Sequence, residues 1–120
     1  MKIRNLATGL QYRGEVSGMR QTYHVFESGK AYVVMSESLS KPDTGYFNLI
    51  SANAVNYVRR NYAGHQNLTA PGLAARSRKP RLVKSALQAL NILYVLVATG
   101  QATRDDRFKD RSLHFNIHPH

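Results

Sequence analysis

Residues 76–100 (RSRKPRLVKSALQALNILYVLVATG) constrain the fold more than any other stretch of this chain. Five of the first nine residues are basic, the following ones suit a long apolar helix, and the stretch stops at a glycine. On a helix of about 100° per residue, the polar side chains fall within an arc of roughly 120° that ends at Asn91, because Ile92 and Val95 lie on the same arc and are apolar. We therefore expect the first half of this helix to expose a polar, cationic face and the second half to be buried on almost every side.

Residues 1–50 have the pattern of β-strands. Residues 10–16, 21–26, 31–36 and 46–50 are separated by turn and loop signals such as Gly29. The third of these runs (AYVVMS) is rich in β-branched and aromatic side chains, which favour strands. Because the connections are short, an antiparallel meander is the simplest arrangement.

The apolar period changes from that of a strand to that of a helix after residue 50. Ser51 or Asn53 is suited to cap a first helix, and Gly64 is suited to end it. Thr69 and Pro71 are typical of the start of a second, shorter helix.

A third helix is predicted over residues 81–98, opened by Pro80 and closed by Gly100. Residues 102–117 then carry a charged tip and an alternating run, which predict a β-hairpin. The expected fold class is α+β, with an N-terminal antiparallel β-meander, a three-helix unit and a C-terminal β-hairpin. We expect a single domain over residues 1–120, in which a β-rich lobe (1–50) joins a helical lobe with the hairpin (51–120).

The order of helix, short helix, longer helix and β-hairpin in residues 51–118 resembles that of winged helix-turn-helix DNA-binding domains. In that family the third helix enters the major groove of DNA and the hairpin meets the backbone. The resemblance lies in the pattern of elements and covers only the C-terminal half of the chain. It implies that the helix 81–98 and the hairpin 102–117 bind duplex DNA, in a role such as transcription regulation.

The net charge also points to a polyanionic partner. Residues 1–58 hold six basic and four acidic side chains, whereas residues 59–120 hold eleven basic and three acidic ones, so most of the net charge of +10 lies in the second half. Such clustering is typical of nucleic-acid-binding domains. Duplex DNA is the favoured partner and RNA comes second. An anionic membrane comes last, because the chain has no basic amphipathic helix with Trp or Phe anchors.

Twelve polar or basic residues are the candidate nucleic-acid contacts. They are Arg76, Arg78, Lys79, Arg81, Lys84, Ser85, Gln88, Asn91, Arg104, Arg107, Lys109 and Arg111. Those from Arg81 to Asn91 carry groups that read base edges, as Arg does for guanine and Gln or Asn for adenine. The three before them suit phosphates at a helix N-terminus, and the four on the hairpin suit the minor groove or the backbone. The alternative is that the helix arc and the hairpin tip are ordinary solvated surfaces, the tip being partly neutralised by three aspartates.

Catalytic and metal-dependent functions find little support in the residues. The chain has no cysteine, which excludes disulfides, thiolate zinc sites and cysteine nucleophiles. Glu27, Glu37 and Asp43 are scattered, so a metal-dependent nuclease centre stays open only as the least favoured alternative. No phosphate-binding loop, dinucleotide fingerprint or serine-hydrolase motif occurs. We expect no enzyme, no catalytic residue, no cofactor and no metal, and we interpret the three histidines of residues 114–120 as surface residues.

Two alternatives to duplex binding are left open. Tyr12, Tyr23, Tyr32 and Tyr46 could stack on the bases of RNA or of a single strand at the sheet surface, or they could fill the seam between the sheet and the helices. The chain could also be a small protein-interaction component of the toxin–antitoxin or phage type, and a homodimer is compatible with either role. The lack of an N-terminal apolar segment and of a run long enough for a bilayer favours a cytoplasmic protein without a membrane partner.

Overall fold

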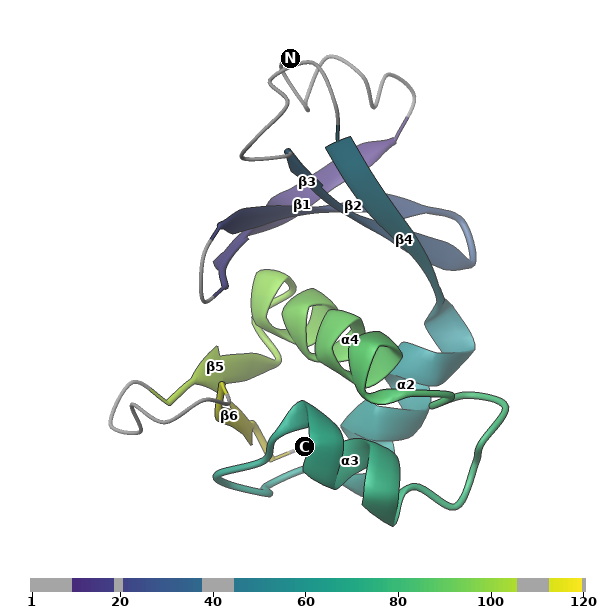
Figure 1. Ribbon diagram of the computed structural model, residues 1–120, viewed down its shortest axis with the longest axis vertical. Coiled ribbons are helices and arrows are strands. Elements are labelled where there is room, and N and C mark those ends of the chain that lie inside the picture. Colours follow the sequence, from purple (N-terminus) through teal and green to yellow (C-terminus); the bar gives the residue numbers. More distant parts are fainter. Residues whose placement is uncertain (1–9, 19–20, 38–44, 106–112, 120) are drawn as a thin grey trace.

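A four-stranded antiparallel meander forms the first half of the fold. The computed structural model describes residues 10–18, 21–37, 45–105 and 113–119. In the sheet each strand pairs with the next in the chain (Figure 1), and the strands are β1 (Gln11–Ser17), β2 (Thr22–Ser28), β3 (Ala31–Glu37) and β4 (Gly45–Ser51). The predicted meander is confirmed.

Alternation along the strands gives the sheet two apolar faces. On the face toward the helices, Val25 pairs with Val34, and both are buried together with Ile50. The opposite face carries a smaller cluster around Phe26 and Val33. The larger of the two faces must therefore be covered by the second half of the chain.

Two short helices follow β4 and begin at residues that the sequence predicted as caps. In α2 (Ala52–Asn61) the Oγ atom of Ser51 accepts a hydrogen bond from the backbone N of Ala54 at 3.1 Å. In α3 (Ala70–Arg76) the Oγ1 atom of Thr69 accepts one from the backbone N of Gly72 at 3.1 Å. Each bond satisfies an N–H group that has no partner inside its helix.

The third helix, α4 (Ala86–Ala98), begins later than predicted. The sequence suggested a helix over residues 81–98, but the carbonyl of Lys79 accepts hydrogen bonds from the backbone N atoms of both Leu82 and Val83 at 2.9 Å. These bonds close a single turn after Pro80, and the side chain of Val83 is then buried in the core. Residues 81–85 are therefore part of the connection between α3 and α4, and the predicted start at residue 81 is wrong.

Side-chain hydrogen bonds set the actual start of α4. The backbone of Ser85 is extended and its Oγ atom accepts a hydrogen bond from the N of Gln88 at 3.1 Å, which makes Ser85 the N-cap. The Oε1 atom of Gln88 in turn accepts a hydrogen bond from the N of Lys84 at 2.7 Å. A serine bonded in this way competes with helical backbone bonds, so the helix does not extend through it.

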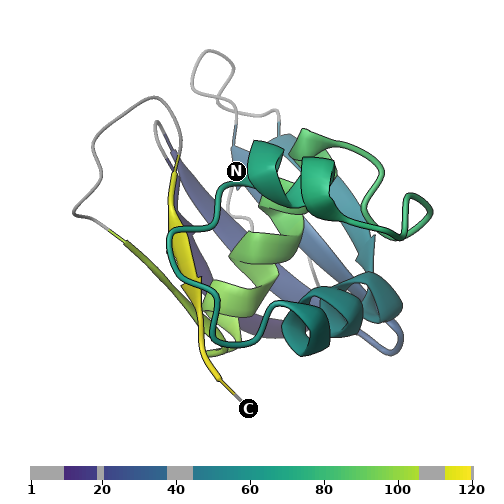
Figure 2. The same cartoon turned by 90° about the horizontal axis from the view of Figure 1, so that it is seen from below.

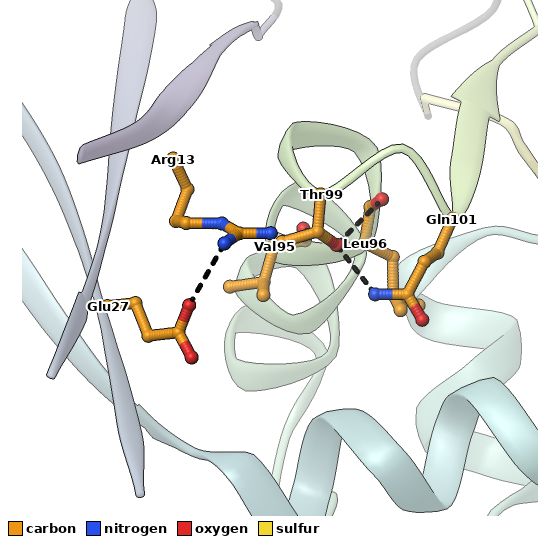
Figure 3. Close-up of polar contacts among 6 residues, drawn as sticks. All are labelled: Arg13, Glu27, Val95, Leu96, Thr99 and Gln101. Atoms are coloured by element: carbon orange, nitrogen blue, oxygen red, sulfur yellow. Dashed lines mark hydrogen bonds and ion pairs between the residues drawn. The ribbon is translucent and has the colours of Figure 1, made fainter. Parts of the chain in front are cut away.

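The other end of α4 is closed by the glycine that the sequence predicted. Gly100 has a φ of 78°, and the N of Gln101 donates to the carbonyl of Leu96 at 2.8 Å, the long hydrogen bond of a Schellman motif. The Oγ1 atom of Thr99 donates to the carbonyl of Val95 and accepts from the Nε2 of Gln101, both at 2.8 Å (Figure 3). These bonds direct the chain out of the helix and into the hairpin.

Helix α4 lies at the centre of the molecule. Figure 1 shows it between the sheet and a second layer formed by α2, α3 and the hairpin of β5 (Ala102–Arg104) and β6 (Phe115–Ile117). Figure 2, seen from below, shows it running across the strands. Residues 92–96 are each at most 2% exposed, which confirms the predicted burial of the second half of the helix. No helix in the part of the chain that the structure describes is long and apolar enough to cross a membrane.

Leu93→Ala is expected to lower the free energy of unfolding by about 2–5 kcal/mol, because this buried side chain would leave a cavity in a packed core. Leu87→Ala is the matched control on the same helix. Its side chain is 62% exposed, so we expect a change within about 0.5 kcal/mol. Urea unfolding followed by circular dichroism measures both, and equal losses would contradict the central position of α4.

Candidate nucleic-acid interface

Five of the predicted contact residues lie together at the end of α3 and on the connection that leads to α4. We call residues 76–84 the basic segment. Its cationic side chains are all exposed, and they are Arg76, Arg78, Lys79, Arg81 and Lys84. Arg76 ends α3, whereas Arg81 and Lys84, which were expected on the third helix, lie on the connection before it.

Contacts with α2 and with the core hold the basic segment in place. The hydroxyl of Tyr57 accepts hydrogen bonds from the backbone N of Arg78 at 3.3 Å and from the Oγ of Ser77 at 3.4 Å. The bond from Ser77 lowers the pKa of the Tyr57 phenol, against the opposing effect of burial. The Oγ of Ser77 also accepts a hydrogen bond from the N of Lys79 at 3.1 Å, and Val83 inserts into the core. The backbone of the segment is therefore fixed while its charged ends point to solvent.

The stretch of sequence around the basic segment contains no acidic residue. None of residues 44–104 is acidic. Among the described residues the only ion pair joins Arg13 and Glu27 of the sheet, at 3.3 Å between Nη1 and Oε1 (Figure 3). Within the described residues, none of the five cations of the segment forms an ion pair.

The C-terminal end of α2 is also basic. Its last turn carries Arg59 and Arg60. Burial and the neighbouring Tyr57 raise the pKa of Tyr62, just beyond this turn, whereas the charges of Arg76 and Arg78 act to lower it. The start of the basic segment therefore lies near Tyr62, whereas the charge of Arg59 acts to lower the pKa of Tyr32 on the sheet.

The polar residues of α4 are not arranged as the sequence suggested. The side chains of Ser85 and Gln88 are engaged in capping hydrogen bonds. Asn91 was expected on an exposed arc, but it is only 2% exposed, and its Nδ2 donates to the carbonyl of Leu87 at 2.9 Å. The difference arises because this side of α4 faces the sheet, which a helical projection of the sequence alone does not show.

The hairpin contributes one described cation. The Nη1 of Arg104 donates to the carbonyl of Ser17 at 2.8 Å and so ties the hairpin to the end of β1. Asp105 is buried, and its Oδ2 accepts a hydrogen bond from Asn116 at 3.3 Å. The other three candidates of the hairpin lie outside the described residues, namely Arg107, Lys109 and Arg111.

The tyrosines of the sheet do not form one stacking platform. Tyr12 packs against Phe26 on the outer face, with ring centroids 5.2 Å apart. Tyr23 instead stacks on Tyr94 of α4 at 4.5 Å, in the seam between the sheet and the helix. Tyr46, on β4, is 58% exposed. Tyr23 therefore fills the seam between the sheet and the helices, whereas Tyr46 is exposed and free to stack on a base.

The residues considered for a nuclease or a metal site are dispersed. Glu27 is paired with Arg13, and both Asp43 and the side chain of Glu37 lie outside the described part. Within the described ranges, no group of three His, Asp or Glu residues is placed to hold a metal ion. His114 is buried in contact with the side chain of Asn67.

A groove between the sheet and α4 was missed by the sequence analysis. Its volume is about 510 Å³, and it is lined by the neighbouring ends of β2, β3 and β4 and by the first half of α4. On the helix its walls include Leu87, Asn91 and Tyr94, which share one face through spacings of four and three residues. The sequence held one sign of this groove, which is the polar residue Asn91 at the point where the helix becomes apolar.

Tyr94 predicts a pH dependence of stability. Burial raises the pKa of its phenol well above the usual value of 10, with a smaller contribution from Tyr23. Above pH about 10 the unfolded chain loses this proton while the folded chain keeps it, so stability is complete below that pH and falls by about 1.4 kcal/mol per pH unit above it. Tyr94→Phe should remove this part of the slope, measured by urea unfolding at pH 9, 10 and 11. Parallel slopes in the two proteins would contradict the burial of the hydroxyl.

Comparison of the chain with the models of known protein families, with curated proteins and with solved structures finds no match in any of the three. Function is therefore inferred from the residues and the geometry of this chain itself.

Proposed function

We propose that this protein binds nucleic acid without catalysing a reaction, and that the basic segment supplies its phosphate contacts. The observation that carries the proposal is the group of five exposed cations on nine residues, none of which has a carboxylate partner in the described structure. The phosphates of a nucleic-acid backbone are suitable partners for this group of cations, because Arg and Lys donate charge-assisted hydrogen bonds to phosphate oxygens.

The distribution of charge favours this role over mere solubility. A soluble surface normally mixes both signs of charge, whereas residues 44–104 contain eight basic and no acidic side chains. The hydrogen bonds to Tyr57 fix the backbone of the segment, so less conformational entropy is lost on binding than with a free loop.

The proposal keeps only part of what the winged-helix resemblance implies. The order of helices and hairpin fits that family, but the side of α4 that bears Asn91 faces the sheet rather than solvent. Binding through phosphates with little reading of base pairs in the major groove is the mode that these positions support. Duplex DNA is the first form to test because it carries the highest density of phosphates, and RNA is the second.

The test is fluorescence anisotropy with a labelled DNA duplex of about 20 base pairs, titrated at about 50 and 200 mM salt. The variant Arg78→Gln/Lys79→Gln/Arg81→Gln should bind at least about tenfold more weakly at the lower salt. The slope of log affinity against log salt should become shallower by about 2.7, since each lost phosphate contact removes about 0.9.

Lys30→Gln provides the control for the loss of charge alone. This exposed lysine lies on the turn between β2 and β3, beside the N-terminal end of α2, whereas the basic segment contacts its C-terminal half. Lys30→Gln should leave the affinity for DNA within about twofold of that of the parent protein. Arg81→Gln, which removes one cation of the basic segment, should lower the affinity by more than about twofold. Absence of binding by the parent protein at low salt, or an unchanged slope in the triple variant, would remove the proposed function.

A further inference from the structure

The groove between the sheet and α4 has the size and lining of a binding site. Its volume of about 510 Å³ falls in the range of small-molecule sites. Tyr23 and Tyr94 form a stacked aromatic wall, and the exposed side chains of Tyr46 and Leu87 also border it. No Lys, Arg, Asp or Glu is among the described residues that line it. These described residues favour an uncharged group in the groove, and a flat aromatic ring fits their aromatic wall best.

Asn91 indicates that the ligand carries a hydrogen-bond donor. The side chain is 2% exposed, and its Oδ1 atom accepts no hydrogen bond within the described structure, whereas its Nδ2 is satisfied by the carbonyl of Leu87. A buried carbonyl oxygen without a partner destabilises a fold, and a leucine, which has the same number of side-chain heavy atoms, would avoid that loss. Because Asn91 lines the groove, an N–H group of a ligand there could supply the missing partner.

The groove and the basic segment lie next to each other along the chain. The segment ends at Lys84, Ser85 caps α4, and Leu87 already borders the groove. Only two residues lie between Lys84 and Leu87, so their Cα atoms are at most about 11 Å apart. A ligand that joins phosphates to flat, uncharged, donor-bearing rings can occupy both places at once.

We propose that the groove binds one unpaired base of a single-stranded nucleic acid, whose Watson–Crick edge donates a hydrogen bond to the Oδ1 of Asn91. This inference rests on the proposed function, because the phosphates next to that base are held by the basic segment. In a duplex the same edge is already paired. A protein with this groove therefore prefers single strands, with the exposed ring of Tyr46 as the stacking partner of the base.

The experiment compares three labelled probes of about 12 nucleotides: a single DNA strand containing all four bases, the same strand with abasic sugars throughout its middle, and the duplex of the same sequence. The parent protein should bind the intact single strand about tenfold more tightly than either of the other two. Asn91→Leu and Tyr46→Ala should each remove most of that preference while leaving the affinity for the duplex unchanged.

Two observations guard against misfolding as an explanation. Asn91→Leu should unfold at the same urea concentration as the parent or at a higher one, since it removes a buried acceptor without a partner. Tyr46 is 58% exposed, so its replacement leaves the core intact. If Asn91→Leu proves less stable, the comparison is decided by Tyr46→Ala.

The outcomes separate this inference from the proposed function. Equal affinity of the parent for all three probes, with weaker binding by the basic-segment variant, would overturn the groove as a base site while the proposed function stands. A preference for the intact strand that survives both groove variants would also overturn it. If the parent binds none of the probes, both proposals are lost.

Discussion

The structure depends on the burial of α4 between two layers. The sheet turns one apolar face toward the helix, and α2, α3 and the hairpin close over its other side (Figures 1 and 2). Both layers contribute to the same apolar cluster around residues 92–96, so the helix and the two layers share one core. Burial of the apolar side chains of this helix is thus the main favourable contribution to the free energy of folding.

The same burial creates the surfaces to which function is assigned. Because α4 is fixed in the core, the connection that leads into it must cross the molecular surface, and its cations are exposed there. Where the first half of the helix leaves the sheet, the groove opens, and Asn91 is the polar side chain kept beside it. A charged connection and an uncharged groove next to each other suit the two parts of a nucleotide, its phosphate and its base.

Local sequence signals predicted most helix and strand ends well. The prediction failed at the start of α4, where two residues could each begin a helix. Ser51, Thr69 and Gly100 were recognised as helix ends because each acts through the backbone beside it. The start of α4 was misjudged, because Pro80 suggested a helix start although Ser85 later supplies the stronger cap. The five cations of the basic segment were identified as candidates from composition, whereas the groove was not, since its walls come from strands and a helix that are distant in sequence.

The sequence by itself determined the α+β order of elements, the buried character of residues 92–96 and the excess of positive charge before them. These properties follow from the period of apolar side chains and from local hydrogen bonding, which act over a few residues. Only the tertiary structure decided which side of α4 faces the sheet, and hence that Asn91 is buried and that the basic segment is a surface connection. The physical reason is that a polar residue on a helix is exposed or buried according to what packs against that side, and this depends on residues far away in the chain.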